Sequence, residues 1–356
     1  MLLILLGEIV LNTNNKVKNS TIIISFLFIL TLCMVIATAI GAVRVPFLDT
    51  IKIILNNFGL THFKITNKRF DSIIFYVRFP RVIVATLVGA ALGLCGAVMQ
   101  GLFRNPMADP GIIGISSGAS FGAVIAIALN LTTVSLYFMP VFAIIGALTS
   151  AFIIYRLASS KGKVPVLTLI LAGIAVSTFI GALTSLILSR IAEYQVREYL
   201  FWSIGSLSGR RWEHVNLSAV PILIGIIILV SFSRELNVLL LGEEEAQSIG
   251  LNPYRARRTI LFFSSIVTAV AVCVSGNIGF VGLIVPHILR LIVGPDNRIL
   301  LPLSALGGAV FLLICDLIAR IIIMPSEIGV GIVTSLVGAP YFLFLLNKSR
   351  KEGVAL

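Results

Sequence analysis

Apolar runs of about twenty residues recur along almost the whole chain, and they constrain its fold more than any other feature. A helix needs roughly 20 apolar residues to cross a membrane. Ten such runs lie at residues 21–43, 81–103, 114–131, 139–157, 166–188, 215–232, 259–275, 278–293, 301–319 and 329–346. Together with their connections they use almost all of the available length, so no separate soluble domain is expected.

The composition agrees with this reading. Of the 356 residues, 58% are hydrophobic and 12% are charged, and the mean hydropathy is +1.07. Soluble proteins carry about 25% charged residues, and half that density cannot cover a compact surface with polar groups. We therefore predict an all-α polytopic membrane protein with about ten transmembrane helices. A single domain, residues 21–346, is expected between an N-terminal tail, residues 1–20, and a C-terminal tail, residues 347–356.

The basic residues are distributed like the loop charges of a membrane protein. The net charge is +12, but Lys and Arg lie between the apolar runs rather than on one polar face. We therefore expect contact with membrane lipid and none with nucleic acid. Ten spans place both termini on one side, and short basic clusters at residues 161–163, 255–258 and 348–351 fall on that side. By the positive-inside rule, both termini are predicted to be cytoplasmic.

No residue pattern in the sequence is typical of an enzyme or a metal site. The four cysteines lie singly inside apolar runs, and none of the three histidines has a ligand partner one helical turn away. The phosphate-binding pattern GxxxxGK[ST] is missing, so nucleotide binding by that loop is not expected. We predict no catalytic residues, no cofactor and no metal, and a permease that moves a solute without changing it.

An ion-coupled secondary transporter is the alternative to a permease driven by another subunit. Such transporters usually carry ionisable residues in mid-membrane, and the spans here are nearly free of them. Asp316 and Arg320 are one helical turn apart near the end of the ninth span, and they are expected to pair with each other. If transport is active, we expect its energy to come from a separate ATPase.

Small residues and prolines mark the region around the second and third spans. Gly89, Gly93 and Ala97 are four residues apart, a spacing that lets two membrane helices pack closely. Residues 105–111, NPMADPG, contain two prolines and a glycine, which forbid a continuous helix. Either Asp109 caps the following helix, or the segment is a hinge at the mouth of a pathway. Composition leaves both interpretations open.

The longest loop on the cytoplasmic side, residues 237–256, contains the sequence LGEEEAQSIGL at residues 241–251. Acidic residues at a helix start and glycine at its end are ordinary capping signals. We therefore predict a short helix here. A solvated helical loop and a docking helix for a cytoplasmic partner both fit the composition.

Several stretches resemble the FecCD family of permeases, the membrane subunits of ABC importers for ferric siderophores, haem and cobalamin. The most specific are RFPRVIVATLVGAALGLCGAVMQGLFRNPMADPGIIGISSGA from residue 78, LGEEEAQSIGL, and GNIGFVGLIVPHILRLIVGPDNRILLPLSALGGA from residue 276. The resemblance implies an ABC importer permease of the large-solute type in the cell membrane of a prokaryote. It also implies two ATPase subunits, an extracytoplasmic solute-binding protein and a second permease subunit, as a homodimer or with a paralogue. Ferric siderophore is the family's commonest cargo, with haem and cobalamin next.

The resemblance assigns roles to residues near the two membrane surfaces. Arg78 and Arg81 of the R-x-P-R motif, together with Arg320, are expected to face outward and bind glutamates of the solute-binding protein. Snorkelling at helix ends would explain each arginine singly. Asn105 and Met107 match positions that narrow the pathway on the cytoplasmic side.

The resemblance also assigns a role to the predicted short helix. Gly242, Glu245, Ala246 and Gly250 resemble the coupling signature of ABC permeases, with Gln247 replacing the third small residue. They are expected to sit in a groove of the ATPase.

Overall fold

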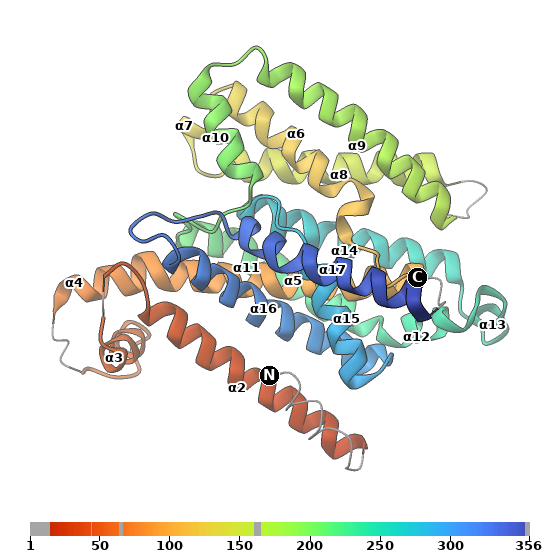
Figure 1. The fold of residues 1–356 in the computed structure, drawn as a ribbon, viewed down its shortest axis with the longest axis horizontal. Helices are drawn as coiled ribbons and strands as arrows, with labels where there is room; N and C mark the ends of the chain where they lie inside the picture. Colours follow the sequence, from red (N-terminus) through yellow and green to blue (C-terminus); the bar gives the residue numbers. More distant parts are fainter. Residues whose placement is uncertain (1–14, 44, 64–66, 160–164, 353–356) are drawn as a thin grey trace.

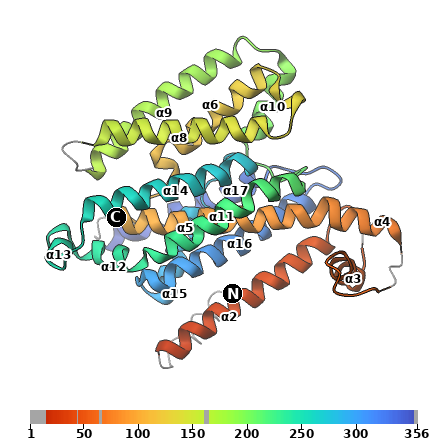
Figure 2. The same cartoon turned by 180° about the vertical axis from the view of Figure 1, so that it is seen from behind.

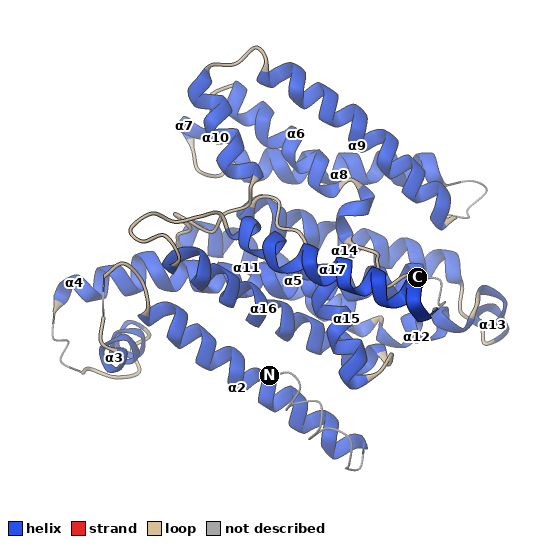
Figure 3. Cartoon of the chain, viewed as in Figure 1, coloured by secondary structure: helices blue, strands red, loops and turns tan. Residues whose placement is uncertain are grey.

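The computed structural model describes residues 15–43, 45–63, 67–159 and 165–352. Within these ranges the chain forms helices and connecting loops, without a strand (Figure 3). In chain order the elements are α2 (Asn15–Ala39), α3 (Phe47–Asn57), α4 (Lys68–Asp71), the π-helix η1 (Ser72–Arg78), α5 (Phe79–Phe103), the 3-10 helix η2 (Pro110–Ile113), α6 (Ile115–Ala128), α7 (Leu131–Val134), α8 (Phe138–Ala158), α9 (Val166–Leu188), α10 (Glu193–Ser203), α11 (Trp212–Ser231), α12 (Ser233–Leu241), α13 (Glu243–Ser248), α14 (Pro253–Ser275), α15 (Val281–Val293), α16 (Asn297–Ile321) and α17 (Val330–Glu352).

Long apolar helices dominate the described part of the chain. Seven are long and apolar enough to cross a membrane, and they correspond to α2, α5, α8, α9, α11, α14 and α16. Shorter apolar helices, Ile115–Ala128, Val281–Val293 and Val330–Leu345, lie in α6, α15 and α17. Each of the ten predicted spans coincides with one of these helices, so the predicted all-α polytopic fold is confirmed.

The membrane helices form two groups, and α14 contacts both (Figures 1 and 2). Helices α6, α8, α9 and α10 pack together at the top of Figure 1. Helices α5, α11, α15, α16 and α17 form the central group, and α2 lies along its lower side against α16. Helix α14 packs on α5 and α11 in the central group and on α6 and α8 in the upper one.

The predicted glycine stripe forms a close contact between α5 and α16 in the central group. A Cβ atom on Gly93 would lie 2.2 Å from the carbonyl oxygen of Ser304, and one on Gly89 would lie 2.4 Å from that of Gly308. Any larger side chain at these positions would clash, so glycine is what lets the backbones of α5 and α16 approach so closely. Membrane helices depend on such close packing because lipid offers no hydrophobic force between them. The packing interpretation of the stripe is confirmed.

Two intervals expected to be polar connections are largely helical. Residues 44–80 contain α3, α4 and η1, and the 237–256 loop contains the end of α12, all of α13 and the start of α14. Helix α14 begins six residues before the predicted span because the side chain of Asn252 accepts a hydrogen bond from Arg255 N at 3.0 Å and Pro253 occupies a first-turn position. Capping residues, which hydropathy ignores, set this boundary.

The two ends of the described chain lie on the same side of the molecule as α13 (Figure 1). Of the predicted N-terminal tail, residues 1–14 lie outside the described residues, and from Asn15 the chain is already in α2. The predicted C-terminal tail continues α17 as far as Glu352, and residues 353–356 lie outside the described ranges. We call this side the α13 end and the opposite side, where α2 ends and α5 begins, the arginine end.

Candidate functional site

Three arginines predicted to face a docking partner gather at the arginine end and are almost completely buried. Arg78 ends η1, Arg81 lies in the first turn of α5, and Arg320 lies in the last turn of α16. Their exposed fractions are 6%, 7% and 5%. We call them the arginine cluster. Burying a cation is costly unless the charge is paired, so the partners of these groups decide what the cluster can do.

One carboxylate, Asp316, is shared by two members of the cluster. Arg81 Nε and Nη2 donate to Asp316 Oδ1 at 3.1 and 2.9 Å, and Arg320 Nε lies 3.1 Å from Asp316 Oδ2. The predicted pairing of Asp316 with Arg320 is confirmed. Arg81 Nη1 also donates to Glu327 Oε2 at 2.7 Å. Three guanidinium groups thus face two carboxylates, and the cluster keeps an excess of one positive charge.

The other hydrogen bonds of the cluster go to backbone carbonyls at and just after the end of α2. The last carbonyls of a helix have no partner within it and carry the negative end of its dipole. Arg78 Nη1 donates to Ala39 O at 2.6 Å, and Nη2 donates to Val43 O at 2.5 Å. Arg320 Nη1 donates to Ala37 O at 2.9 Å. These two arginines therefore fasten the end of α2 to the central group.

A cavity of about 180 Å³ opens beside the cluster. It is lined by residues that include all three arginines, Glu327, Gly41 and Pro325. Arg320 Nη2 is buried and, among the described residues, has no hydrogen-bond partner. The side chain of Glu327 is 35% exposed. One unused donor and one displaceable carboxylate would let the cavity accept a carboxylate from outside.

Sequence reasoning missed Glu327 as a member of this site. It lies between α16 and α17, and its contact with Arg81 joins residues 246 positions apart in the chain. The available signal was an isolated acidic residue in a connection at the end that carries the arginines.

Residues 105–111, for which the sequence leaves a cap and a hinge open, form successive turns in which side chains accept hydrogen bonds from the backbone. Asn105 Oδ1 accepts from Met107 N at 2.8 Å, so the two residues assigned to the gate lie together in one turn, and both are half-buried. Asp109 Oδ1 accepts from Gly111 N at 2.8 Å and caps η2. Burial raises the pKa of the Asp109 carboxyl, against the opposing effect of that hydrogen bond. The capping interpretation of Asp109 is confirmed.

The predicted short helix is α13, and glycines bound it on both sides. Gly242 precedes it with φ of 148°, and Gly250 follows it with φ of 85°. At its end, Leu251 N donates to Ala246 O at 3.0 Å and Gly250 N donates to Gln247 O at 2.9 Å, the pair of bonds that a left-handed glycine allows. Ala246 is fully buried, whereas Glu245 is exposed.

Helix α13 is tied to α14 through one side chain. Glu243 Oε1 accepts a hydrogen bond from Arg257, and Glu243 Oε2 accepts one from the hydroxyl of Tyr254 at 3.2 Å. Ile249, the residue that follows α13, is 64% exposed. Sequence reasoning did not single out either Glu243 or Ile249. An apolar tip on a braced helix in a polar segment is suited to contact another protein.

Comparisons of the sequence and of the structure with known proteins all find ABC transporters or their permease proteins. The sequence model of the FecCD transport family matches residues 29–348. The cobalamin import system permease protein BtuC of Halobacterium salinarum is 47% identical over 271 residues, which cover 76% of this chain and 72% of that protein. The hemin transport system permease protein HmuU of Yersinia pestis is 43% identical over 279 residues, covering 78% and 83%. A solved inward-facing ABC transporter of metal-chelate type has a TM-score of 0.81 and 34% identity, covering 92% of this chain and 99% of that one.

These matches confirm the resemblance inferred from the motifs. The two relatives are named as permease proteins of a cobalamin import system and a hemin transport system, and the solved ABC transporter shares the helical fold described above. The chain is therefore an integral membrane permease of the ABC-importer type, and it belongs to the FecCD transport family.

Proposed function

We propose that this chain is the permease subunit of an ATP-driven importer that carries a metal-chelate solute, with ferric siderophore before haem or cobalamin. Relatives named for cobalamin and for hemin are similarly close, at 47% and 43% identity, so the class of large chelates is better supported than any one member. The partners would be two ATPase subunits, an extracytoplasmic solute-binding protein and a second permease, either a copy of this chain or a paralogue. Both termini would lie in the cytoplasm of a prokaryotic cell, with the α13 end facing inward.

At the outer surface, we propose that the arginine cluster holds the solute-binding protein. Burial of Arg78, Arg81 and Arg320 leaves few free donors, so an incoming carboxylate must use Arg320 Nη2 or displace Glu327 from Arg81. The excess positive charge of the cluster and its forked guanidinium groups favour such an exchange. Glu327 would then be an internal competitor of the partner's glutamates.

This proposal makes opposite predictions for two variants. Glu327→Gln should strengthen capture of the solute-binding protein, because it removes the competitor and leaves Asp316 in place. Arg78→Glu combined with Arg81→Glu should weaken capture and reduce its salt dependence. Glu193→Gln, which removes an exposed carboxylate paired with Arg197, is the control. If Glu327→Gln folds normally and leaves both affinity and salt dependence unchanged, the cluster only fastens α2.

At the inner surface, we propose that α13 sits in a groove of the ATPase and that Asn105 and Met107 narrow the pathway. The support for coupling is that Gly242 and Gly250 delimit a short helix, with Ala246 buried beneath it and Glu245 exposed. Because Glu243 joins α13 to Arg257 of α14, movement of α13 would reach a membrane helix directly. The turn that carries Asn105 and Met107 follows α5, so a shift of α5 would move it.

The observation that carries the overall proposal is the family match over residues 29–348. The direct test is uptake of a ferric siderophore, haem or cobalamin into proteoliposomes that hold this chain, its ATPase and its binding protein. Uptake should require ATP and the ATPase and should survive ionophores that collapse ion gradients. Uptake that persists without the ATPase and stops with the gradient would instead identify an ion-coupled secondary transporter.

A further inference from the structure

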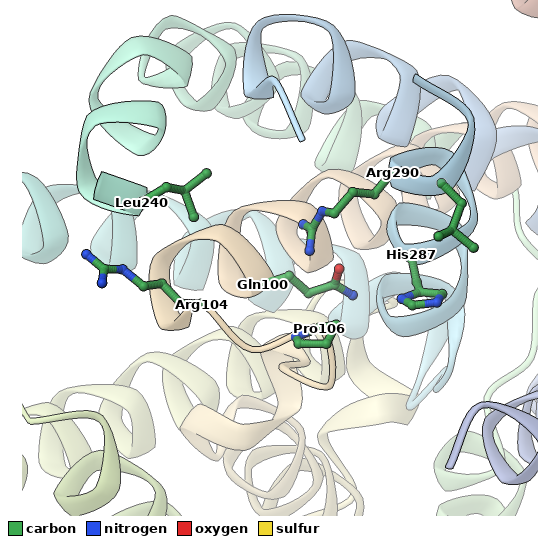
Figure 4. A pocket seen from close by; sticks show the side chains of 7 residues that line it. Gln100, Arg104, Pro106, Leu240, His287 and Arg290 are labelled. Atoms are coloured by element: carbon green, nitrogen blue, oxygen red, sulfur yellow. The ribbon is translucent and has the colours of Figure 1, made fainter. Parts of the chain in front are cut away.

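A second basic cavity (Figure 4) lies at the end of α5 opposite the arginine cluster, because Arg81 is in the first turn of α5 and Arg104 follows its last turn. It has a volume of about 370 Å³ and lies between the end of α5, the end of α12 and α15. Its polar lining consists of Gln100, Arg104, His287 and Arg290, and Leu240 and Leu291 are among its apolar lining residues. We call it the inner basic cavity. Pro106, which lies between the proposed gate residues Asn105 and Met107, also lines it, but the transport scheme above assigns no role to its arginines or to Gln100.

The two arginines of this cavity differ in how they are held. Arg104 follows α5, and its Nε donates to Leu239 O at 3.0 Å, which closes the end of α12. Arg290 lies in the last turn of α15 and is half-buried. Among the described residues the side chain of Arg290 forms no ion pair and no hydrogen bond, and it extends toward Gln100 (Figure 4). A partly buried guanidinium without an acceptor is costly unless an anion completes it.

Gln100 supplies a second unsatisfied group with a fixed orientation. Pro286 has no N–H, so the carbonyl of Gly282, four residues earlier in α15, lacks its helical donor. Gln100 Nε2 donates to that carbonyl at 3.3 Å and to Leu283 O at 3.0 Å. The other atom of this amide, Oε1, makes no such bond. This oxygen is buried and has no donor among the described residues, and the residue itself is 1% exposed.

The chemistry of the ligand follows from these two groups. No carboxylate belongs to the lining of the cavity, which carries two arginines, so the ligand is an anion. Gln100 also lines the cavity, and its Oε1 atom is an unsatisfied acceptor that a ligand carrying a hydrogen-bond donor would complete. Leu291, at the edge of the cavity, is 72% exposed on an apolar membrane helix, where acyl chains would cover it. Basic pockets between membrane helices near the cytoplasmic surface are typical sites for anionic headgroups.

We propose that the inner basic cavity binds the headgroup of an anionic phospholipid that carries a polyol, such as phosphatidylglycerol. The phosphate accepts from Arg290 and from the remaining donors of Arg104, and a headgroup hydroxyl donates to Gln100 Oε1. The acyl chains lie over Leu291 and the outer face of α15. The bound lipid thereby joins α5, α12 and α15 next to α13.

The test uses the purified full-length chain in nanodiscs of phosphatidylcholine with increasing phosphatidylglycerol. Thermal unfolding and native mass spectrometry report stabilisation and retained lipid. Wild type should gain stability with phosphatidylglycerol, and Arg290→Gln should lower its apparent affinity at least about tenfold. Arg298→Gln removes an exposed charge from the start of α16 at the same end and should behave as wild type. Arg290→Lys should retain weaker binding and guards against a folding defect in Arg290→Gln.

Three results would overturn the proposal. One is a phosphatidylglycerol response that is absent, or that falls equally in the Arg290 and Arg298 variants. Another is equal stabilisation, dependent on Arg290, by inorganic phosphate or glycerol phosphate, which would identify a free anion as the ligand. The third is that, in pure phosphatidylcholine, Arg290→Gln abolishes binding of the ATPase while phosphatidylglycerol has no effect on either protein. That result would assign the cavity to a carboxylate of the ATPase. Gln100→Leu sharpens the headgroup assignment, because it should reduce the preference for phosphatidylglycerol over phosphatidic acid.

Discussion

At the arginine end, three guanidinium groups are held by two carboxylates and by the last carbonyls of α2. At the α13 end, two guanidinium groups share a cavity whose lining contains no carboxylate. The first set is more buried yet almost fully partnered, and the second is more open yet incomplete. Burial therefore does not distinguish a structural arginine from a ligand-binding one. The number of guanidinium donors that have a partner distinguishes the two kinds of arginine.

The same contrast separates the two ends energetically. Removing one partner from a completed buried pair leaves an uncompensated charge, whereas removing a charge that has no partner releases a cost that was already present. Substitutions at the arginine end should therefore damage the folded protein in any medium. Those at the α13 end should matter only when an anion is available.

The largest effect is expected for Asp316→Asn. The side chain of Asp316 is fully buried and serves both Arg81 and Arg320, so the substitution should cost about 3–5 kcal/mol of unfolding free energy. Unfolding by SDS titration in mixed micelles measures it. Glu193→Gln, which breaks the exposed pair with Arg197, should cost no more than about 1 kcal/mol. Equal losses would show that Asp316 is not the shared anchor.

A smaller loss is expected for Arg78→Gln. Its guanidinium donates to the carbonyls of Thr38, Ala39 and Val43 around the end of α2. Because glutamine can still donate to one of these carbonyls and no buried charge is left unpaired, the total loss of unfolding free energy should be about 1.5–3 kcal/mol. We expect unfolding at lower SDS and faster amide exchange in the last turn of α2. An unchanged exchange rate in α2 would contradict the proposed fastening role.

Arg290→Gln should be nearly neutral by the same measurement in neutral lipid. Because no described group pairs with the Arg290 side chain, the substitution should cost no unfolding free energy and should raise it by up to about 0.5 kcal/mol. The matched comparison with Arg78→Gln tests the contrast between the two ends directly. A loss as large as that of Arg78→Gln would mean that Arg290 is completed within the chain.

The smallest effect concerns salt. Raising ionic strength from about 0.1 to 1 M shortens the screening length from roughly 10 to 3 Å, but it acts weakly on buried pairs. The unfolding free energy lost in Asp316→Asn should therefore be the same at both salt concentrations. The stabilisation of wild type by phosphatidylglycerol should decline with salt. Salt sensitivity at the arginine end would instead indicate that its pairs are open to solvent.

Much of the fold was predictable because membrane helices are specified locally. Each of the ten apolar runs is a helix, and the i, i+4 spacing of Asp316 and Arg320 was enough to predict their contact. The capping signals of α13 likewise gave a short helix bounded by Gly242 and Gly250.

The partners of the arginines could not be predicted in this way. Arg81 meets Asp316 across 235 positions, and Arg78 meets backbone carbonyls of α2, which have no signature in the sequence. These contacts depend on how α2, α5 and α16 pack. Docking through Arg78, Arg81 and Arg320, as the resemblance implies, would therefore use Arg320 Nη2 or displace Glu327 from Arg81.

Helix α14 has one more consequence for a molecule built from two groups of helices. Its 23 residues form a rod about 34 Å long, at 1.5 Å per residue. The helix begins beside the ion pair between Glu243 of α13 and Arg257, and it contacts both the upper and the central group. It is followed by Gly276, which packs so closely on the end of α10 that a Cβ there would lie 2.1 Å from Trp202 O. A displacement of α13 at one surface of the membrane would therefore reach the other surface along a single helix that contacts both groups of helices.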